Sequence, residues 1–287
     1  MDSPSRPARI DDIVGVMENA WPQDSAEEWD VVGLTVGDPR LEITRVLFAV
    51  DPTMAVAREA ERAGAQLIVT HHPLLMRGVH AVDAGDAKGA VIHRLIQGGI
   101  ALINAHTNAD IAPDGVSQTL IEALGVKESR PLNAPEPRPC ASSGPGRVGD
   151  LAREESLNQF AQRVAAALPA TAGGVRVAGP PDGRVRRVAV CGGAGDGYFD
   201  LVRASGADVY VTSDLRHHPA SEARETALAG RGTPYLVDVS HWAGESLWTA
   251  QAARTVVDGL RARGITVEAT VSVTNTDPWT FQLPSGE

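Results

Sequence analysis

The stretch Ala65-Gln66-Leu67-Ile68-Val69-Thr70-His71-His72-Pro73 decides how the chain is organised, because an apolar run ends in it at two adjacent imidazoles. Such a run is typical of a buried parallel strand, and Pro73 keeps His72 extended. Histidine is the commonest protein metal ligand, and α/β proteins place their chemistry at strand ends. Neighbours on a strand point to opposite faces. The pair is therefore either two loop histidines without a shared task, or a site where the backbone turns or each ring serves its own ion.

The residues around this strand predict a strand–helix–strand unit. Residues 45–51 form a continuous apolar run, Pro52-Thr53 opens a helix through Arg62, and Gly64 suits its end. The spacing of apolar residues predicts further helices over residues 9–20, 88–97 and 114–124, a buried strand over residues 100–105 and a loose tail over residues 1–8.

A proline- and glycine-rich stretch over residues 131–147 interrupts this pattern and is the best candidate for a boundary. Strands and helices alternate again after it, as far as a final strand near residues 265–273. We therefore expect an N-terminal α/β half over residues 1–130, a linker over residues 131–147 and a C-terminal α/β half over residues 148–287.

Two stretches of the chain align without a gap over one strand–helix–strand unit, which predicts two related α/β halves with mostly parallel sheets. Both stretches then reach a His-His-Pro sequence, directly at residues 71–73 and after the insertion Ser213–Arg216 at residues 217–219. Any two such units share apolar strands and a glycine, but that alternative leaves the paired arginines, threonines and histidines unexplained. The matching positions are Arg45-Val46 with Arg187-Val188, Gly64-Ala65 with Gly206-Ala207, and Thr70 with Thr212.

The composition is that of a globular protein, with 43% hydrophobic and 22% charged residues. A formal net charge of −10 argues against nucleic acid as a partner, since duplex binding needs clustered Lys and Arg. Cys140 and Cys191 show no metal or disulfide spacing. The sequence has no apolar signal core and no run long enough to cross a membrane, so we expect a cytoplasmic protein.

Imidazoles and carboxylates follow several of the predicted strands. Because parallel strands collect their carboxyl ends at one edge of a sheet, these side chains can meet in one pocket. His241 and Glu245 are four residues apart on a predicted helix, so they share a face and can bind one ion or bridge two. The candidate side chains are His71, His72, His106, Asp110, His241 and Glu245.

These segments resemble the metal-site motifs of the Nif-three-like family, whose members are named GTP cyclohydrolase I type 2 homologues. The resemblance covers the chain from about Ile10 to Arg263 and rests on three motifs together, His71–Pro73, His106–Asp110 and His241–Glu245. The chain departs from the family pattern at Val31, Ser213, Ser240 and Gly244, none of which is a ligand position.

The resemblance implies one composite domain with a metal site at the strand ends between the two halves. It implies two divalent ions (zinc, manganese or iron), with Glu245 as a bridging carboxylate. It also implies a homohexamer with its sites facing an internal cavity. The ligand positions that match are His71, His72, Asp110, His241 and Glu245.

Two functions from different classes fit these residues. The first is a metal-dependent hydrolase for a nucleotide-like or phosphorylated small molecule, with GTP ring opening as the reaction that the family name indicates. His106, His217 and His218 are then candidates for acid–base work, and we expect His106 to shape the ligand loop more than to bind metal. The second is a metal-binding assembly without turnover, such as a metal chaperone, a sensor or a scaffold.

The segment Gly192–Gly197 follows a strand and could hold a phosphate. It lacks the Lys-Ser/Thr of a P-loop and the glycine spacing of a dinucleotide fingerprint. We therefore interpret it as a structural turn.

Overall fold

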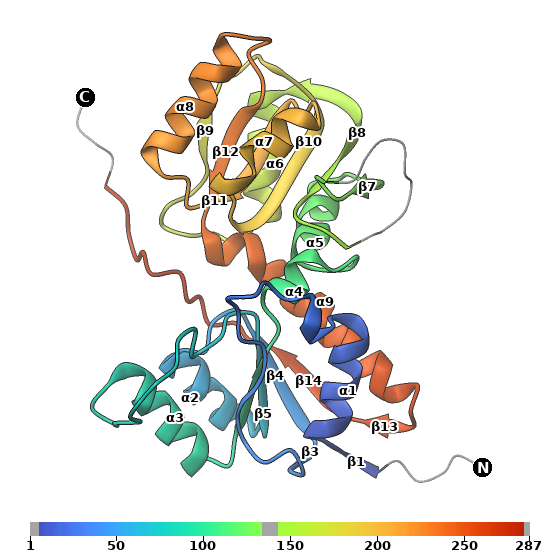
Figure 1. Cartoon of the computed structure of the whole chain (residues 1–287), viewed down its shortest axis with the longest axis vertical. Helices are drawn as coiled ribbons and strands as arrows, with labels where there is room; N and C mark the ends of the chain where they lie inside the picture. Colours follow the sequence, from blue (N-terminus) through green and yellow to red (C-terminus); the bar gives the residue numbers. More distant parts are fainter. Residues whose placement is uncertain (1–5, 134–142, 284–287) are drawn as a thin grey trace. The chain divides into compact units, whose positions relative to one another are not determined.

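The computed structural model describes residues 6–133 and 143–283 and divides into two compact units. The first unit takes the chain up to Ala109 together with Thr249–Thr276, and the second takes Asp110–Trp248 and the chain from Asp277 onward. The chain thus leaves the first unit at Ala109 and not at the predicted linker, of which residues 134–142 lie outside the described part. Helix α9 (His241–Arg261) begins in the second unit and ends in the first (Figure 1).

The first unit is built on a five-stranded sheet. Its parallel strands read as near-continuous apolar runs because helices cover both faces, with α2 and α3 on one side and α1 and the end of α9 on the other (Figure 1). Every residue of β5 and β6 is buried. The strand order is β14 (Glu268–Val271), β4 (Arg45–Ala49), β5 (Leu67–Thr70), β6 (Ala101–Asn104) and β2 (Gly33–Val36), with only β2 antiparallel to its neighbour.

The helices of the first unit form where the apolar spacing predicts them. They are α1 (Ile10–Ala20), α2 (Met54–Ala63) and α3 (Ala87–Gln97). Thr53 caps α2 by accepting the Val56 N–H, and Gly64 ends it in the left-handed conformation at φ 64°. The apolar faces of α2 and α3 pack on Leu47, Ile68 and Leu102 of the sheet.

The predicted loose tail at residues 1–8 is wrong for its described part. Residues Arg6–Arg9 form β1, which pairs with β3 (Glu42–Ile43) and with β13 (Ile265–Thr266) near the other end of the chain. The strand depends on partners remote in sequence, and its own residues carry no alternation that would reveal it.

The second unit contains a six-stranded mixed sheet. Three central strands are parallel and the outer ones are antiparallel, so the structure confirms an α/β fold whose central strands are parallel in both units. The strand order is β7 (Ser129–Arg130), β8 (Arg147–Ser156), β10 (Arg184–Ala194), β11 (Val209–Ser213), β12 (Tyr235–Val239) and β9 (Arg176–Ala178).

Helices cover this second sheet with two apolar clusters. Phe160 and Val164 of one cluster and Phe199 and Val202 of the other pack against its buried strands. The helices between β6 and α9 are α4 (Thr107–Ile111), α5 (Val116–Ala123), α6 (Leu157–Ala167), α7 (Phe199–Ala204) and α8 (His217–Leu228).

The two aligned stretches make the same hydrogen bonds at the same positions. Arg45 Nη1 donates to the Ala63 carbonyl at 3.2 Å, and Arg187 Nη1 donates to the Ser205 carbonyl at 3.3 Å. These matching bonds support the predicted repeat.

A second feature of the repeat is a side-chain oxygen, called the staple below, that accepts two backbone N–H groups at the start of the first strand. Gln66 Oε1 accepts the N–H groups of Thr44 and Arg45, each at 2.9 Å. At the matching position Asp208 Oδ2 accepts the N–H groups of residues 186 and 187, at 2.9 and 2.8 Å.

The repeat ends differently from the prediction. Counting on from Thr70 and Thr212, the places of His71 and His72 are taken by Ser213 and Asp214, at the end of β11. His217 and His218 instead begin α8 and are exposed. The two His-His-Pro sequences are therefore not equivalent in the fold.

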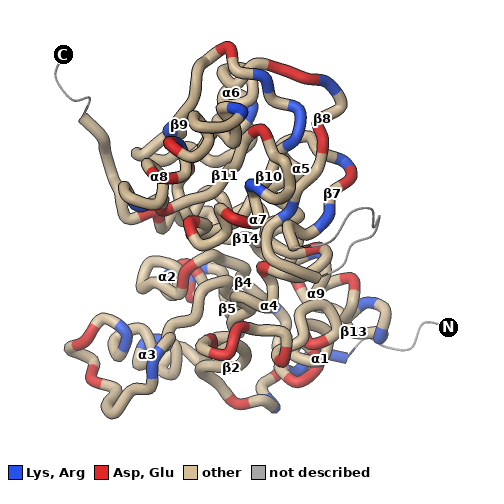
Figure 2. The backbone as a smooth tube through the Cα atoms, turned by 45° about the horizontal axis from the view of Figure 1, so that its top comes forward, with Lys and Arg blue, Asp and Glu red and all other residues tan. Residues whose placement is uncertain are grey.

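Charged residues of both signs are interspersed along β7 and β8 (Figure 2). Ion pairs such as Arg187–Asp150 and Arg163–Glu155 match them locally. The mixture gives this part of the described surface no basic stripe of the kind that nucleic acids require. No helix in the described residues is long and apolar enough to cross a membrane.

The staple at Asp208 yields a stability prediction. Asp208→Ala removes the acceptor of two backbone N–H groups, so we expect the free energy of unfolding to fall by about 1–3 kcal/mol. Urea denaturation measures it. Asp200→Ala is the matched control, because Asp200 is 91% exposed and pairs only with Arg203 on its own helix; equal losses in the two variants would contradict the role of the staple.

Candidate metal centre

Three histidines of the first unit form a cluster at the carboxyl ends of β5 and β6. The nitrogen atoms that His71, His72 and His106 can offer lie within 4.8 Å of one another. The ring centroids of His71 are 5.0 Å from His72 and 5.2 Å from His106. His71 is fully buried, and the other two are partly exposed.

The sequence brings these rings together because β5 and β6 are parallel neighbours. The backbone of His71 and His72 continues to bond the β4 side, to the carbonyls of Ala49 at 3.2 Å and Val50 at 2.9 Å. Thr70 Oγ1 donates to the His72 carbonyl at 2.8 Å and fixes the turn after the strand. Both rings therefore belong to one cluster, because the backbone turns after the strand although the two histidines are adjacent in the sequence.

Each of the three rings has its Nδ1 held by an oxygen. His71 Nδ1 lies 2.9 Å from the Ala105 carbonyl, His72 Nδ1 2.7 Å from Asp51 Oδ1, and His106 Nδ1 3.0 Å from Asp30 Oδ1. An oxygen acceptor at Nδ1 places the N–H there and leaves the Nε2 lone pair to bind an electrophile. This is the usual environment of a metal-binding histidine.

Asp30 fixes the loop that carries His106. Its Oδ2 accepts the Thr107 hydroxyl at 2.6 Å and the Thr107 N–H at 3.1 Å, while Oδ1 contacts His106. Burial raises the pKa of Asp30, but the bonds from His106 and Thr107 outweigh it and hold the pKa well below its ordinary value. Asp30 is thus an anion that orients His106.

The second unit holds the predicted pair on the first turn of α9. His241 Nε2 lies 2.9 Å from Glu245 Oε1, and its Nδ1 lies 2.6 Å from Asp214 Oδ2. A neutral imidazole carries one N–H and can donate to only one carboxylate. The arrangement therefore suits a cation, either a second proton or a metal ion, between Nε2 and Glu245.

Gly193 makes room for this pair. A Cβ on Gly193 would lie 2.7 Å from Glu245 Oε1 and 3.3 Å from His241 Nε2, and its φ of +70° also favours glycine. Gly192 to Ala194 belong to β10, so the predicted turn is wrong for those residues; the chain leaves the strand only at Gly195. The glycines admit the two side chains, and no contact identifies them as a phosphate site.

Asp110, the remaining predicted ligand, lies on α4, and a buried arginine fixes the chain that follows this helix. Arg147 donates to the Ala112 carbonyl at 2.6 Å and to the Gly144 carbonyl at 2.9 Å, and the Gly144 N–H donates to the Ile111 carbonyl at 2.8 Å. Burial lowers the pKa of Arg147 to about 10, where it is still charged at neutral pH. These bonds fix the backbone just after Asp110.

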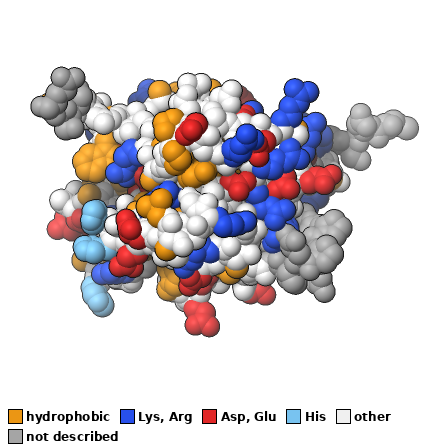
Figure 3. Space-filling view, turned by 90° about the horizontal axis from the view of Figure 1, so that it is seen from above, with side chains coloured by type: hydrophobic (Ala, Val, Ile, Leu, Met, Phe, Trp, Pro, Cys, Tyr) orange, Lys and Arg blue, Asp and Glu red, His pale blue; other side chains and the backbone are white. Residues whose placement is uncertain are grey.

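Other predicted residues lie apart from these clusters. His217 and His218 contact each other with ring centroids 5.3 Å apart and are exposed at the start of α8; Figure 3 shows histidine side chains exposed at one side of the view from above. Trp29 is 58% exposed and meets the ring of His106 edge-on.

Sequence reasoning missed Asp51 and Asp30, which hold two of the rings, and it did not pair Asp214 with His241. Asp51 lies two residues after β4 and Asp214 directly follows β11, and these positions at strand ends could have indicated both. Asp30 lies in a loop that follows no strand directly. Asp214 has φ +55°, the one positive value outside glycine in the described residues, and its bond to His241 shows why that conformation is kept.

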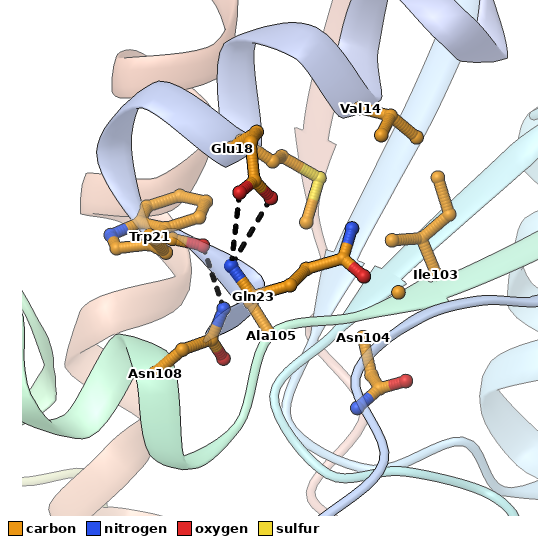
Figure 4. Close-up of a pocket in the computed structure, with 10 residues that line it drawn as sticks. Val14, Glu18, Trp21, Gln23, Ile103, Asn104, Ala105 and Asn108 are labelled. Carbon is orange, nitrogen blue, oxygen red and sulfur yellow. Dashed lines mark hydrogen bonds between the residues drawn. The ribbon is translucent and has the colours of Figure 1, made fainter. Parts of the chain in front are cut away.

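A separate small pocket in the first unit lies between α1 and the loop after β6 (Figure 4). Its polar groups are used for support: Asn108 Nδ2 donates to the Trp21 carbonyl at 2.7 Å, and the Gln23 N–H donates to Glu18 at 3.1 Å. None of the clustered histidines lines it. The pocket is thus part of the scaffold that positions the His106 loop.

The fold and these clusters define an α/β protein with the side chains of a metal centre. The family model for Duf34/NIF3 (NGG1p interacting factor 3) matches residues 8–278, and the chain belongs to this family.

Relatives in several bacteria support this assignment. The "GTP cyclohydrolase 1 type 2 homolog" of Streptomyces coelicolor is 47% identical over 279 residues, covering 96% of this chain and 95% of that protein. The protein of the same name from Mycobacterium tuberculosis is 34% identical, covering 97% and 98%. The Bacillus cereus protein related to NIF3 has a TM-score of 0.86 at 26% identity, covering 97% of this chain and all of that one.

The anionic state of Asp30 predicts a pH dependence. Because the folded state lowers its pKa, the stabilisation is complete above the unfolded value of about 4 and is lost as the pH falls through the lower folded value. Asp30→Asn should therefore cost about 2 kcal/mol at pH 7, and the difference from the natural protein should shrink below about pH 4. Urea unfolding across this range measures it, with exposed Asp24→Asn as control; a difference that stays constant with pH would contradict the assignment.

The close approach at Gly193 predicts a second effect. Gly193→Ala should lower the free energy of unfolding by roughly 1–3 kcal/mol, because alanine at a positive φ is strained and its Cβ displaces Glu245. Gly197→Ala is the control, since no atom lies within 4 Å of a Cβ there and no positive φ is present. Thermal and urea unfolding compare the two, and a harmless Gly193→Ala would show that Glu245 does not need this space.

Proposed function

We propose that this chain binds divalent metal ions and acts as a metal-dependent hydrolase on a nucleotide-like or phosphorylated small molecule. The proposal takes two ions, with His71 and His72 as ligands from the first unit and Asp110, His241 and Glu245 from the second. The observation that carries it is the set of oxygen acceptors at the Nδ1 atoms, which reserves Nε2 for an electrophile in His71, His72 and His241.

The donor set fits such ions. Imidazole nitrogen and carboxylate oxygen are the usual ligands of zinc, manganese and iron. The absence of a Cβ at Gly193 lets Glu245 Oε1 and His241 Nε2 lie 2.9 Å apart, close enough to bind one ion together. Cys191 does not belong to the set: burial raises the pKa of its thiol well above the ordinary value, so it stays a thiol and not a metal-binding thiolate.

The chemistry that a divalent ion supplies when bound is Lewis-acid activation of water and of a substrate oxygen. The chain contributes fixed donors and proton carriers. Asp51 and Asp214 hold the rings of His72 and His241, so their Nε2 atoms need no reorientation. His106, oriented by Asp30, can exchange a proton with substrate through Nε2.

The candidates for further acid–base work are His217 and His218. Their exposure leaves both rings accessible to a substrate or to bulk solvent. We propose His217 and His218 as proton donors or acceptors, with His106 as the third candidate.

The name shared by the relatives, "GTP cyclohydrolase 1 type 2 homolog", supports a nucleotide as substrate. GTP ring opening is a hydrolysis and fits the donor set, as does hydrolysis of a phosphoester. We also propose a cytoplasmic homohexamer, on the family resemblance. The alternative is a metal-binding assembly without turnover.

The metal assignment gives the first test. We expect the purified protein to retain zinc, manganese or iron by elemental analysis. His71→Ala and Glu245→Ala should each weaken metal affinity by at least tenfold, because each removes a ligand. His93→Ala is the control, since His93 is exposed and contacts only the Val82 carbonyl. Metal at background level, or equal uptake by His71→Ala, would contradict the proposal.

A turnover assay then separates the enzyme from the assembly. Protein loaded with each metal is offered GTP and simple phosphoesters, and products are followed by chromatography and phosphate release. Turnover that Asp110→Ala and Glu245→Ala abolish supports the hydrolase. Tight metal binding with no turnover on any substrate favours the chaperone, sensor or scaffold.

A further inference from the structure

The segment that follows the last strand makes unusually dense polar contacts. We call residues 272–279 the C-terminal segment. Its first part is anchored on α2 by one carboxylate: Glu59 accepts the Ser272 hydroxyl at 2.6 Å, the Val273 N–H at 3.0 Å and the Thr274 hydroxyl at 2.6 Å. Burial raises the pKa of Glu59, but these bonds outweigh it and keep the pKa below its ordinary value. Glu59 thus anchors the first part of the segment on α2.

The next contact reaches a proposed metal ligand. The Thr276 hydroxyl donates to Asp51 Oδ2, while Asp51 Oδ1 holds His72 Nδ1 at 2.7 Å. A carboxylate bonded at one oxygen can still rotate about its Cβ–Cγ bond. The bond at the second oxygen fixes that rotation, and with it the direction in which the His72 ring points.

The following residue acts in the same way in the second unit. Asp277 Oδ2 accepts the Ser240 hydroxyl, and Oδ1 accepts the Trp279 N–H at 2.9 Å. Ser240 Oγ in turn accepts the Ala243 N–H at 3.2 Å, the bond of an N-terminal helix cap. Because the Ser240 hydroxyl donates its proton to Asp277, a lone pair of Ser240 Oγ faces the Ala243 N–H. Asp277 thereby fixes the turn that bears His241.

We propose that Thr276 and Asp277 are positioning residues for the metal centre, Thr276 through Asp51 on His72 and Asp277 through Ser240 on His241. This rests on the proposed metal binding. Two adjacent residues thereby orient one proposed ligand in each unit. Glu59 holds Ser272 and Thr274 in the same segment, which allows the Thr276 bond to be compared with a bond that reaches no proposed ligand.

Two threonines of the segment offer a matched test. Thr276→Val and Thr274→Val each delete one hydroxyl that bonds a carboxylate, at sites of similar partial burial, but only the first carboxylate holds a metal ligand. We expect Thr276→Val to weaken zinc affinity by about tenfold, the low end of the effect of outer contacts on metal affinity. Thr274→Val should leave it unchanged, and Thr276→Ser should restore it. Affinity is measured by competition with a chromogenic chelator.

A second readout is independent of metal. ¹⁵N chemical shifts of the His72 ring in metal-free protein report which nitrogen carries the proton. Thr276→Val should shift the Nδ1-protonated form toward the mixture seen in free imidazole, while Thr274→Val should not. A structural role alone would lower the thermal midpoint of both variants and leave these shifts equal.

The second half of the proposal has its own test. Asp277→Ala and Ser240→Ala should each weaken zinc affinity, and the double variant should be no worse than the stronger single one, because both act through one bond. Additive losses would overturn that route.

The outcomes separate the two proposals. If the natural protein binds no metal, the proposed function fails. If it binds metal and Thr276→Val binds as tightly as Thr274→Val, with unchanged His72 shifts, then only the positioning role fails.

Discussion

The candidate centre depends on oxygen atoms that hold the Nδ1 side of its histidines. The Ala105 carbonyl, Asp51, Asp30 and Asp214 each take one ring, and each comes from a strand end or a loop beside one. Because these acceptors fix both the proton and the ring plane, the imidazoles are organised before any ion arrives. The rest of the structure serves these contacts: parallel strands bring the turns together, and Arg147 and Glu59 fix the loops around them.

Much of the fold could be predicted from the sequence because its elements are locally encoded. Apolar runs mark β4, β5 and β6, and Thr53 and Gly64 mark the ends of α2. The candidate residues at strand ends followed from the same pattern. What could not be predicted depends on remote partners, as with β1, whose pairing with β13 joins opposite ends of the chain.

The pairing of each supporting carboxylate with its histidine could not be predicted for the same reason. Asp30 meets His106 across 76 positions of sequence, and Asp214 meets His241 across 27. An aspartate in a loop is ordinary until its partner is known. The internal repeat misled in one respect, because it paired two His-His-Pro sequences that the fold keeps apart, whereas Ser213 and Asp214 stand where the first pair would predict histidines.

The division of the chain has a consequence for how the protein is made. The first unit takes β14 from residues 268–271 as an edge of its sheet, yet its other strands lie before residue 105. During synthesis on the ribosome this sheet must wait with an open edge at β4 while the whole second unit emerges. That unit can fold early, because its sheet lies within residues 129–239. Residues Arg6–Arg9 of β1 are in the same position, because their partner β13 is made only after the second unit's sheet.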